Sequence, residues 1–205
     1  MLSFLNASQV CMMIKRLYVH SSIYDAFLAK FTPIVQSFQV GDGAKEGTFI
    51  GPLQNGMQYE KTKDIFSSIK SQNLTATLGG SITESSGFFI PPTIIDNPPD
   101  DSRVVQEEPF APILPVLKWD DEEDVLARAN ASDSGLGASV WSKDMDRARR
   151  IADRLEAGNV WINTHLEASP FAPFGGHKSS GLGTEWGLQG LTGYCNSQTL
   201  WVKKG

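Results

Sequence analysis

Apolar runs typical of strands alternate with helical patterns along this chain, and this alternation limits the fold more than any other feature. It predicts repeated β-α-β units with right-handed crossovers. We therefore expect an α/β fold, with a mostly parallel twisted sheet covered by helices. Strands are predicted at 16–20, 75–78, 88–95, 113–119, 137–142, 159–163 and 194–203, and helices at 21–39, 54–71, 144–157 and from 120 onward.

Individual residues predict where these helices begin and end. Ser22 is the expected N-cap of the helix at 21–39, and Pro33 predicts a kink or break inside it. The acidic run at 120–124 is better explained as the negatively charged first turn of a helix than as a metal site. Gly158 is expected to end the helix at 144–157.

Composition and charge argue against several classes of function. The 205 residues are 40% apolar and carry a net charge of −5, which suits a globular protein and disfavours a nucleic-acid partner. We expect no membrane association, since no apolar stretch has the length of a membrane helix. Cys11 and Cys195 form neither a disulfide framework nor a metal-ligand spacing, which indicates a reducing compartment such as the cytoplasm.

Cys11 is the first candidate for chemistry, because it lies where a loop is predicted to become a short helix. The positive end of a helix dipole favours a thiolate, and Lys15 and Arg16 add positive charge nearby. A thiolate is a nucleophile, which suggests covalent catalysis. The alternative is that Cys11 is a small buried apolar residue.

A second segment, residues 107–112, combines acids with a constrained ring. Glu107 and Glu108 precede Phe110, which lies between two prolines that limit backbone flexibility. A carboxylate can accept two hydrogen bonds from a ribose diol, and a ring can stack on a planar heterocycle. The alternative is a turn at a sheet edge with solvated acids.

A third segment, residues 170–183, is rich in glycine, proline and phenylalanine. It lacks the spacing of a phosphate-binding loop. Its glycines are expected to permit close backbone packing, while its phenylalanines form the wall of a pocket. His177 is a candidate base for Cys11, or alternatively a structural residue.

Together and in this order, the three segments resemble the aldehyde dehydrogenase superfamily. Residues 6–11 match its Asn-x-Gly-Gln-x-Cys segment, and 107–112 match Glu-Glu-x-Phe-x-Pro. Residues 173–181 match Pro-Phe-Gly-Gly-x-Lys-x-Ser-Gly, and the tail at 185–194 is most similar to fungal members. The resemblance covers essentially the whole chain and implies that family's catalytic-domain fold, with a C-terminal oligomerisation strand.

By this resemblance, Cys11 is the nucleophile of an NAD(P)-dependent aldehyde dehydrogenase. Its thiolate would attack an aldehyde to form a thiohemiacetal, and hydride transfer to NAD or NADP would leave a thioester. Water would then release a carboxylic acid. The backbone N–H of Cys11 would be one donor of the oxyanion hole.

The resemblance also implies residues that bind the cofactor. Glu108 would hold the nicotinamide ribose, and Phe110 would pack near the nicotinamide. Gln58 and Lys61 would contact the ribose region of the cofactor. No metal ion is implied.

Other residues are implied on the substrate side. Phe174, Leu166 and Ala168 would line the substrate tunnel, and Asn163 would anchor a loop. The implied partners are a small-molecule aldehyde and, in the full-length protein, further copies of the same subunit.

One residue departs from the family pattern. The glycine of the family's cysteine segment is Ser8 here. If this position requires a positive φ, a serine there is strained, because only glycine adopts that conformation at low cost.

The resemblance further implies that a cofactor-binding domain, a general-base glutamate and an oxyanion-hole asparagine precede the cysteine segment. None of these matches this sequence, which opens directly in packed-looking residues 1–5. We therefore expect a catalytic domain at 1–185 and a C-terminal segment at 186–205, without the N-terminal cofactor-binding domain. NAD or NADP would be bound mainly by that domain, and this chain alone is expected to be inactive.

Two other functions remain as alternatives. A non-catalytic truncated paralogue could associate with full-length subunits by pairing its strand at 198–203 with their sheet. A cysteine hydrolase could combine Cys11 with His165 or His177, although the other two motifs would then be unexplained.

Overall fold

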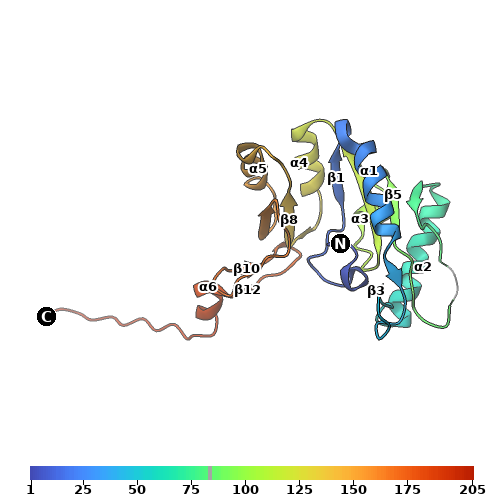
Figure 1. Cartoon of the computed structure of the whole chain (residues 1–205). Helices are drawn as coiled ribbons and strands as arrows, with labels where there is room; N and C mark the ends of the chain where they lie inside the picture. The colour runs from blue at the N-terminus through green and yellow to red at the C-terminus, as the bar shows by residue number, and fades with distance from the viewer. Residues whose placement is uncertain (83–84) are drawn as a thin grey trace. The chain divides into compact units, whose positions relative to one another are not determined.

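A computed structural model of the chain describes residues 1–82 and 85–205. Within these residues, the chain forms two compact units, Met1–Ser132 and Asp133–Gly205. Figure 1 traces the chain through both units. No helix in the described ranges combines the length and the apolar character that crossing a bilayer requires.

The first unit is built on a four-stranded sheet in the order β1-β6-β5-β4. β6 lies between β1 and β5 and runs parallel to both, whereas β4 pairs antiparallel with β5. The predicted mostly parallel sheet is therefore confirmed. The strands are β1 (Leu17–His20), β4 (Ala76–Leu78), β5 (Thr93–Asp96) and β6 (Ile113–Trp119).

Helices cover this sheet and enclose its apolar core, as Figure 1 shows for α1 and α2. Ile94 and Leu114 are completely buried and lie opposite each other in the pairing of β5 with β6. The other elements of this unit are η1 (Leu5–Ser8), α1 (Ser21–Gln36), β2 (Gln39–Val40), β3 (Thr48–Ile50), α2 (Gly56–Ser71), α3 (Arg103–Gln106) and α4 (Glu122–Asn130).

The ends of α1 differ from the prediction. Its N-cap is His20 and not Ser22, because the His20 ring nitrogen accepts the Ser22 backbone N–H at 3.2 Å. Nor does Pro33 break the helix, which continues to Gln36. A proline removes one backbone donor, and so close to the helix end this loss affects a single turn.

Tyr24 anchors α1 to the sheet. Its buried hydroxyl lies 2.6 Å from Asp96 Oδ1 at the end of β5 and 2.9 Å from the Val116 carbonyl oxygen in β6. Burial, together with the hydrogen bond to Asp96, raises the pKa of Tyr24. The hydroxyl therefore stays neutral and available as a donor.

The acidic run at 120–124 begins a helix, as predicted. Asp121 is the N-cap of α4, and its side chain accepts the Asp124 backbone N–H at 2.9 Å. Negative charges at this end of a helix interact favourably with its dipole.

The second unit contains a parallel strand pair, β8 (Gly137–Val140) with β9 (Asn159–Ile162), joined through α5 (Met145–Ala152). α5 ends five residues before the predicted end at 157. Two short antiparallel pairs and one short helix complete the unit. They are β7 (Ser134–Gly135) with β11 (His177–Lys178), β10 (Phe174–Gly175) with β12 (Thr184–Glu185), and α6 (Gly187–Thr192).

The prediction that Gly158 ends α5 is wrong, because α5 ends at Ala152. Gly158 instead permits close packing. A Cβ atom at this position would lie 1.9 Å from the Gly175 carbonyl oxygen, so no side chain fits. The neighbouring Asn159 amide donates to the same carbonyl at 3.0 Å. The predicted role of glycines in close backbone packing is therefore found between β9 and the segment that matches the third family motif.

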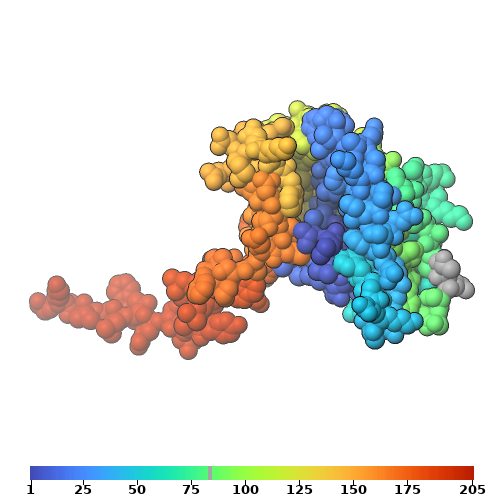
Figure 2. All heavy atoms as spheres, in the orientation of Figure 1, coloured from blue at the N-terminus to red at the C-terminus, as the bar shows by residue number. Residues whose placement is uncertain are grey.

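The predicted strand at 194–203 does not form in the single chain. Residues 194–203 have no regular secondary structure, and Figure 2 shows the end of the chain as a thin extension. Leu200, Trp201 and Val202 are exposed. A strand needs a neighbour for its backbone hydrogen bonds, and the described residues of this chain do not provide one.

Candidate active site

Cys11 lies on an exposed loop, not at the start of a helix. The 3-10 helix η1 precedes it, and Cys11 itself lies within a turn, in which the Met13 N–H donates to the Val10 carbonyl at 3.0 Å. The predicted contribution of a helix dipole is therefore wrong. The alternative of a buried apolar cysteine is also wrong, because Cys11 is exposed. We call residues 5–15 the cysteine loop.

The backbone of the cysteine loop is strained just before Cys11. Asn6, Ala7 and Ser8 all have left-handed conformations, with φ values of 54°, 54° and 63°. Ser8 is buried, and its hydroxyl donates to the Ser3 carbonyl at 2.6 Å. The strain expected for a serine in place of the family glycine is confirmed, and a buried hydrogen bond partly offsets it.

Two substitutions separate these effects. We expect Ser8→Ala to lower the free energy of unfolding by about 1–2 kcal/mol, because the buried hydrogen bond is lost while the strain remains. Ser8→Gly should be more stable than Ser8→Ala by about 1 kcal/mol, because glycine accepts a positive φ. Urea denaturation of both variants measures the difference. Equal stability of the two would contradict a strained Ser8.

Gln9 ties the cysteine loop to the following part of the chain. Its side-chain amide donates to the Pro52 carbonyl at 3.3 Å, and its oxygen accepts the Gln54 N–H at 2.9 Å. The sequence analysis did not predict this contact, because it joins two segments that lie far apart in the chain. The contact holds the cysteine loop against residues 52–54.

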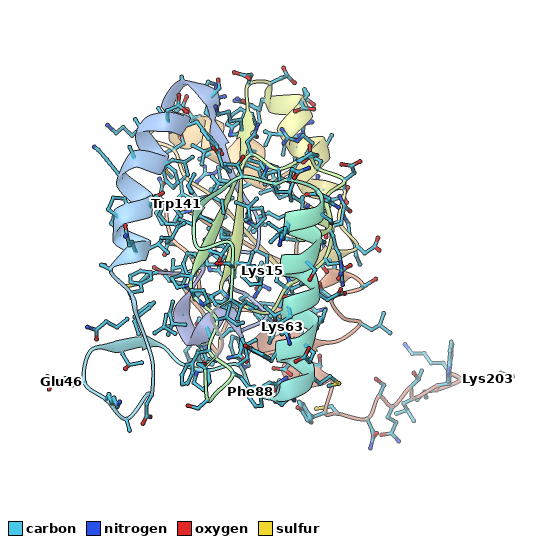
Figure 3. The ribbon with its side chains drawn as sticks, turned by 90° about the vertical axis from the view of Figure 1, so that its right-hand side faces the viewer. Lys15, Glu46, Lys63, Phe88, Trp141 and Lys203 are labelled. Atoms are coloured by element: carbon cyan, nitrogen blue, oxygen red, sulfur yellow. The ribbon has the colours of Figure 1, made fainter. Side chains whose placement is uncertain are left out.

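Lys15 crosses from the cysteine loop to the segment at 107–112. Its Nζ donates to the Ser8 carbonyl at 2.5 Å, lies 3.7 Å from Glu108 Oε1 and lies 4.7 Å from the centre of the Phe110 ring. The Lys15 side chain is only 16% exposed. In Figure 3 it is seen between α1 and α2, whereas Glu46 lies on a loop at the edge of the view.

Burial of the Lys15 side chain disfavours its charged form. Burial lowers the pKa of Lys15 to about 8, and the negative charges of Glu108 and of a Cys11 thiolate oppose this shift. Arg16, the other basic residue noted in the sequence, is directed elsewhere and donates to the Ala129 carbonyl at 3.3 Å. Of these two residues, Lys15 therefore supplies the positive charge to the cysteine loop.

The two adjacent acids at 107 and 108 have different surroundings. Glu107 pairs with Arg103 at 2.5 Å, and Arg103 also binds Asp64 in α2 at 2.6 Å. Glu108 pairs with Lys15, and its side chain is 46% exposed. Arg103 thus connects α3 and Glu107 with α2, while Glu108 remains accessible to a ligand.

Phe110 is fixed by its backbone and by α2. Its φ is 48°, a left-handed value that is unusual for an aromatic residue. The side-chain amide of Gln58, in the first turn of α2, donates to the Pro109 carbonyl at 2.7 Å. Gln58 therefore positions the segment at 107–112. Lys61 lies three residues further along α2 and is exposed.

The predicted substrate-side residues all belong to the second unit. Phe174 is partly buried in β10, and its ring packs 5.2 Å from that of Trp186. Leu166 and Ala168 lie on the loop that follows β9, where Leu166 has a φ of 65° and Ala168 is exposed. Asn163 bonds to the Ser142 backbone through both ends of its amide, which supports its predicted loop-anchoring role.

The two histidines considered as bases have structural surroundings. His165 is buried, with its ring 4.8 Å from that of Trp161. His177 is exposed in β11, where it pairs with Gly135. These contacts favour structural roles for both residues.

Comparison with known proteins finds relatives over nearly the whole chain. Residues 1–200 match the profile of the aldehyde dehydrogenase family. Aldehyde dehydrogenase LUC3 from a Fusarium species is 38% identical over 97% of this chain and 42% of its own length. Betaine aldehyde dehydrogenase from Rhizobium leguminosarum is also 38% identical, over 99% of this chain and 42% of its own length.

Solved structures give the same result. An NAD+ complex of an aldehyde dehydrogenase from Bacillus cereus matches with a TM-score of 0.93 and 33% identity. The match covers 98% of this chain and 41% of that one. The chain therefore spans about two fifths of the length of the relatives it matches.

Proposed function

The chain belongs to the aldehyde dehydrogenase family, and we propose that it is the C-terminal catalytic portion of an NAD(P)-dependent enzyme that oxidises an aldehyde to a carboxylic acid. One observation carries this proposal. The exposed Cys11 lies on a loop that Lys15 ties to Glu108 and Phe110. A nucleophile and a segment suited to a nucleotide thus belong to one connected site.

In the proposed reaction, the Cys11 sulfur bonds to the aldehyde carbon, and the carbonyl oxygen becomes the hydroxyl of a thiohemiacetal. The carbon–hydrogen bond then breaks and the hydride departs with its electron pair, while the hydroxyl loses its proton to solvent and the carbon–oxygen double bond re-forms, leaving a thioester on Cys11. Water adds to the thioester carbon, the carbon–sulfur bond breaks, and the carboxylic acid is released. The backbone N–H of Cys11 would stabilise the developing oxyanion.

A bound NAD or NADP would supply the hydride acceptor. The residues present fit such a group, since the Glu108 carboxylate is half exposed and can accept hydrogen bonds from ribose hydroxyls. Phe110 would pack near the nicotinamide. Gln58 would act indirectly, because it holds the Pro109 carbonyl, and Lys61 would contact the ribose region.

Several finer assignments belong to the same proposal. Phe174, Leu166 and Ala168 would line the passage for the aldehyde, and the full-length protein would be a cytoplasmic homo-oligomer. The cofactor would be bound mainly by a domain that precedes the cysteine loop in the full-length protein. The general base would also come from that region, so the 205-residue chain would be inactive as a dehydrogenase.

Two assays on the purified 205-residue chain test this proposal. We expect aldehyde oxidation with NAD or NADP to be slower than in a full-length relative by at least a factor on the order of 10²–10⁴, the typical contribution of a general base. An activated ester should still acylate Cys11, because this step needs no cofactor. Mass spectrometry of the peptide that contains Cys11 detects the acyl group. Aldehyde oxidation at the rate of a full-length relative would contradict the proposal that the active site of this chain is incomplete. A Cys11 that is not acylated would contradict the proposal that Cys11 is the nucleophile.

The exposed C-terminus favours a second candidate function. Leu200, Trp201 and Val202 are exposed in a segment whose sequence predicts a strand. The chain could therefore be a non-catalytic subunit whose terminal residues pair with the sheet of a full-length aldehyde dehydrogenase. Co-purification with such a partner, together with an unreactive Cys11, would favour this function over the first.

A further inference from the structure

We infer that Lys15 is a positioning residue of the proposed active site, which holds Glu108 and Phe110 against the cysteine loop and supplies positive charge to the Cys11 thiolate. This inference rests on the proposed function, since it requires Cys11 to react as a thiolate. It adds a residue that lies outside the three segments on which the family resemblance was based.

The first argument is the convergence of three groups on one ammonium. The Ser8 carbonyl belongs to the cysteine loop, whereas the Glu108 carboxylate and the Phe110 ring belong to the segment at 107–112. A lysine ammonium has three donors and can serve several partners at once. Lys15 is thereby a direct link between the loop of the nucleophile and the residues proposed to bind the cofactor.

The second argument concerns the backbone at the two ends of this link. Ser8 and Phe110 both have left-handed conformations, with φ values of 63° and 48°. Strained residues persist only where their surroundings hold them. Lys15 contacts both, through the Ser8 carbonyl and the Phe110 ring. Its placement is therefore suited to keeping two strained segments in their active arrangement.

The third argument is electrostatic. Among the described residues, the titratable groups that act on Lys15 are Glu108 and Cys11, and both are negative when ionised. The attraction between Lys15 and a Cys11 thiolate is mutual, so a charged Lys15 stabilises the thiolate. Burial lowers the pKa of Lys15 to about 8. This charge is therefore present at pH 7 and lost by pH 10.

The pH dependence of Cys11 alkylation separates an electrostatic role from a merely structural one. All variants carry Cys195→Ser, so that iodoacetamide, a neutral reagent, reports on Cys11. We expect Lys15→Met to slow alkylation of Cys11 at pH 7 by roughly three- to tenfold, because it removes the attraction of a charge pair near a protein surface. At pH 10, where Lys15 is itself neutral, the two rates should converge.

Two further variants complete the experiment. Lys15→Arg keeps the charge at every pH, so it should restore the rate at pH 7 and match the parent rate at pH 10, where a thiol is ionised with or without a neighbouring charge. Lys30→Met, at an exposed position of α1, is the matched control and should alkylate like the parent. Circular dichroism checks that each variant is folded.

The possible failures are distinguishable. Equal rates for Lys15→Met and its parent at pH 7 would overturn the inference, and so would an equal slowing at all pH values, which indicates a structural role. Neither result would contradict the proposal that Cys11 is the nucleophile. A Cys11 that resists alkylation in the parent would overturn both this inference and the proposed function.

Discussion

Replacing Cys11 with alanine is expected to abolish ester hydrolysis by the chain. The rate should fall to that of the uncatalysed reaction, a loss on the order of 10²-fold or more, because alanine offers no atom to carry the acyl group. A chromogenic acetate ester provides the measurement. The covalent adduct should disappear from the same peptide in the mass spectrum.

The second cysteine provides the control for this experiment. Cys195 is also exposed, but it lies beyond α6 in the second unit and outside the three matched segments. Cys195→Ala should hydrolyse the ester at the parent rate. Loss of hydrolysis in Cys195→Ala, or its survival in Cys11→Ala, would contradict the assignment of Cys11 as the nucleophile.

The second large effect is expected in the core of the first unit. Ile94→Ala should lower the free energy of unfolding by about 2–5 kcal/mol, because it removes buried methyl groups and leaves a cavity in the sheet. Ile94 is completely buried opposite Leu114. Urea denaturation followed by circular dichroism measures the shift.

An identical substitution at the surface shows what burial contributes. Ile34 in α1 is 56% exposed, so Ile34→Ala should change stability by no more than about 0.5 kcal/mol. Similar losses at positions 34 and 94 would mean that the sheet does not form the core described here.

The sequence was most informative where local pattern and tertiary structure agree. The strand predicted at 113–119 forms with the same ends, because its apolar residues suit the centre of a parallel sheet covered on both faces. The acidic run at 120–124 became a helix start, since helix capping depends on neighbouring residues alone. Motif spacing likewise selected the segment at 107–112, and the fold places its Glu108 and Phe110 next to Lys15 of the cysteine loop.

The errors occurred where distant residues decide the structure. The loop at Cys11 has an apolar composition that suits a helix, but its left-handed residues and the bonds from Gln9 to Pro52 and Gln54 determine another path. The segment at 194–203 has the composition of a strand but lacks a pairing neighbour among the described residues. The sequence placed the positive charge of Lys15 near Cys11, but the contacts of Lys15 with Glu108 and Phe110 join segments that lie far apart in the chain, so no local pattern could reveal them.

The close approach of Gly158 to Gly175 has a consequence for how the history of this family is interpreted. A Cβ atom at Gly158 would lie 1.9 Å from the Gly175 carbonyl oxygen, so any side chain at position 158 requires the backbone at 175 to move, whereas a Cβ atom at Gly175 would instead approach Gly183 and Thr184. A descendant that has lost the nucleophile but still folds in this way is therefore expected to keep Gly158. Retention of this glycine marks a preserved architecture, and only the residues around Cys11 can tell whether catalysis has survived with it.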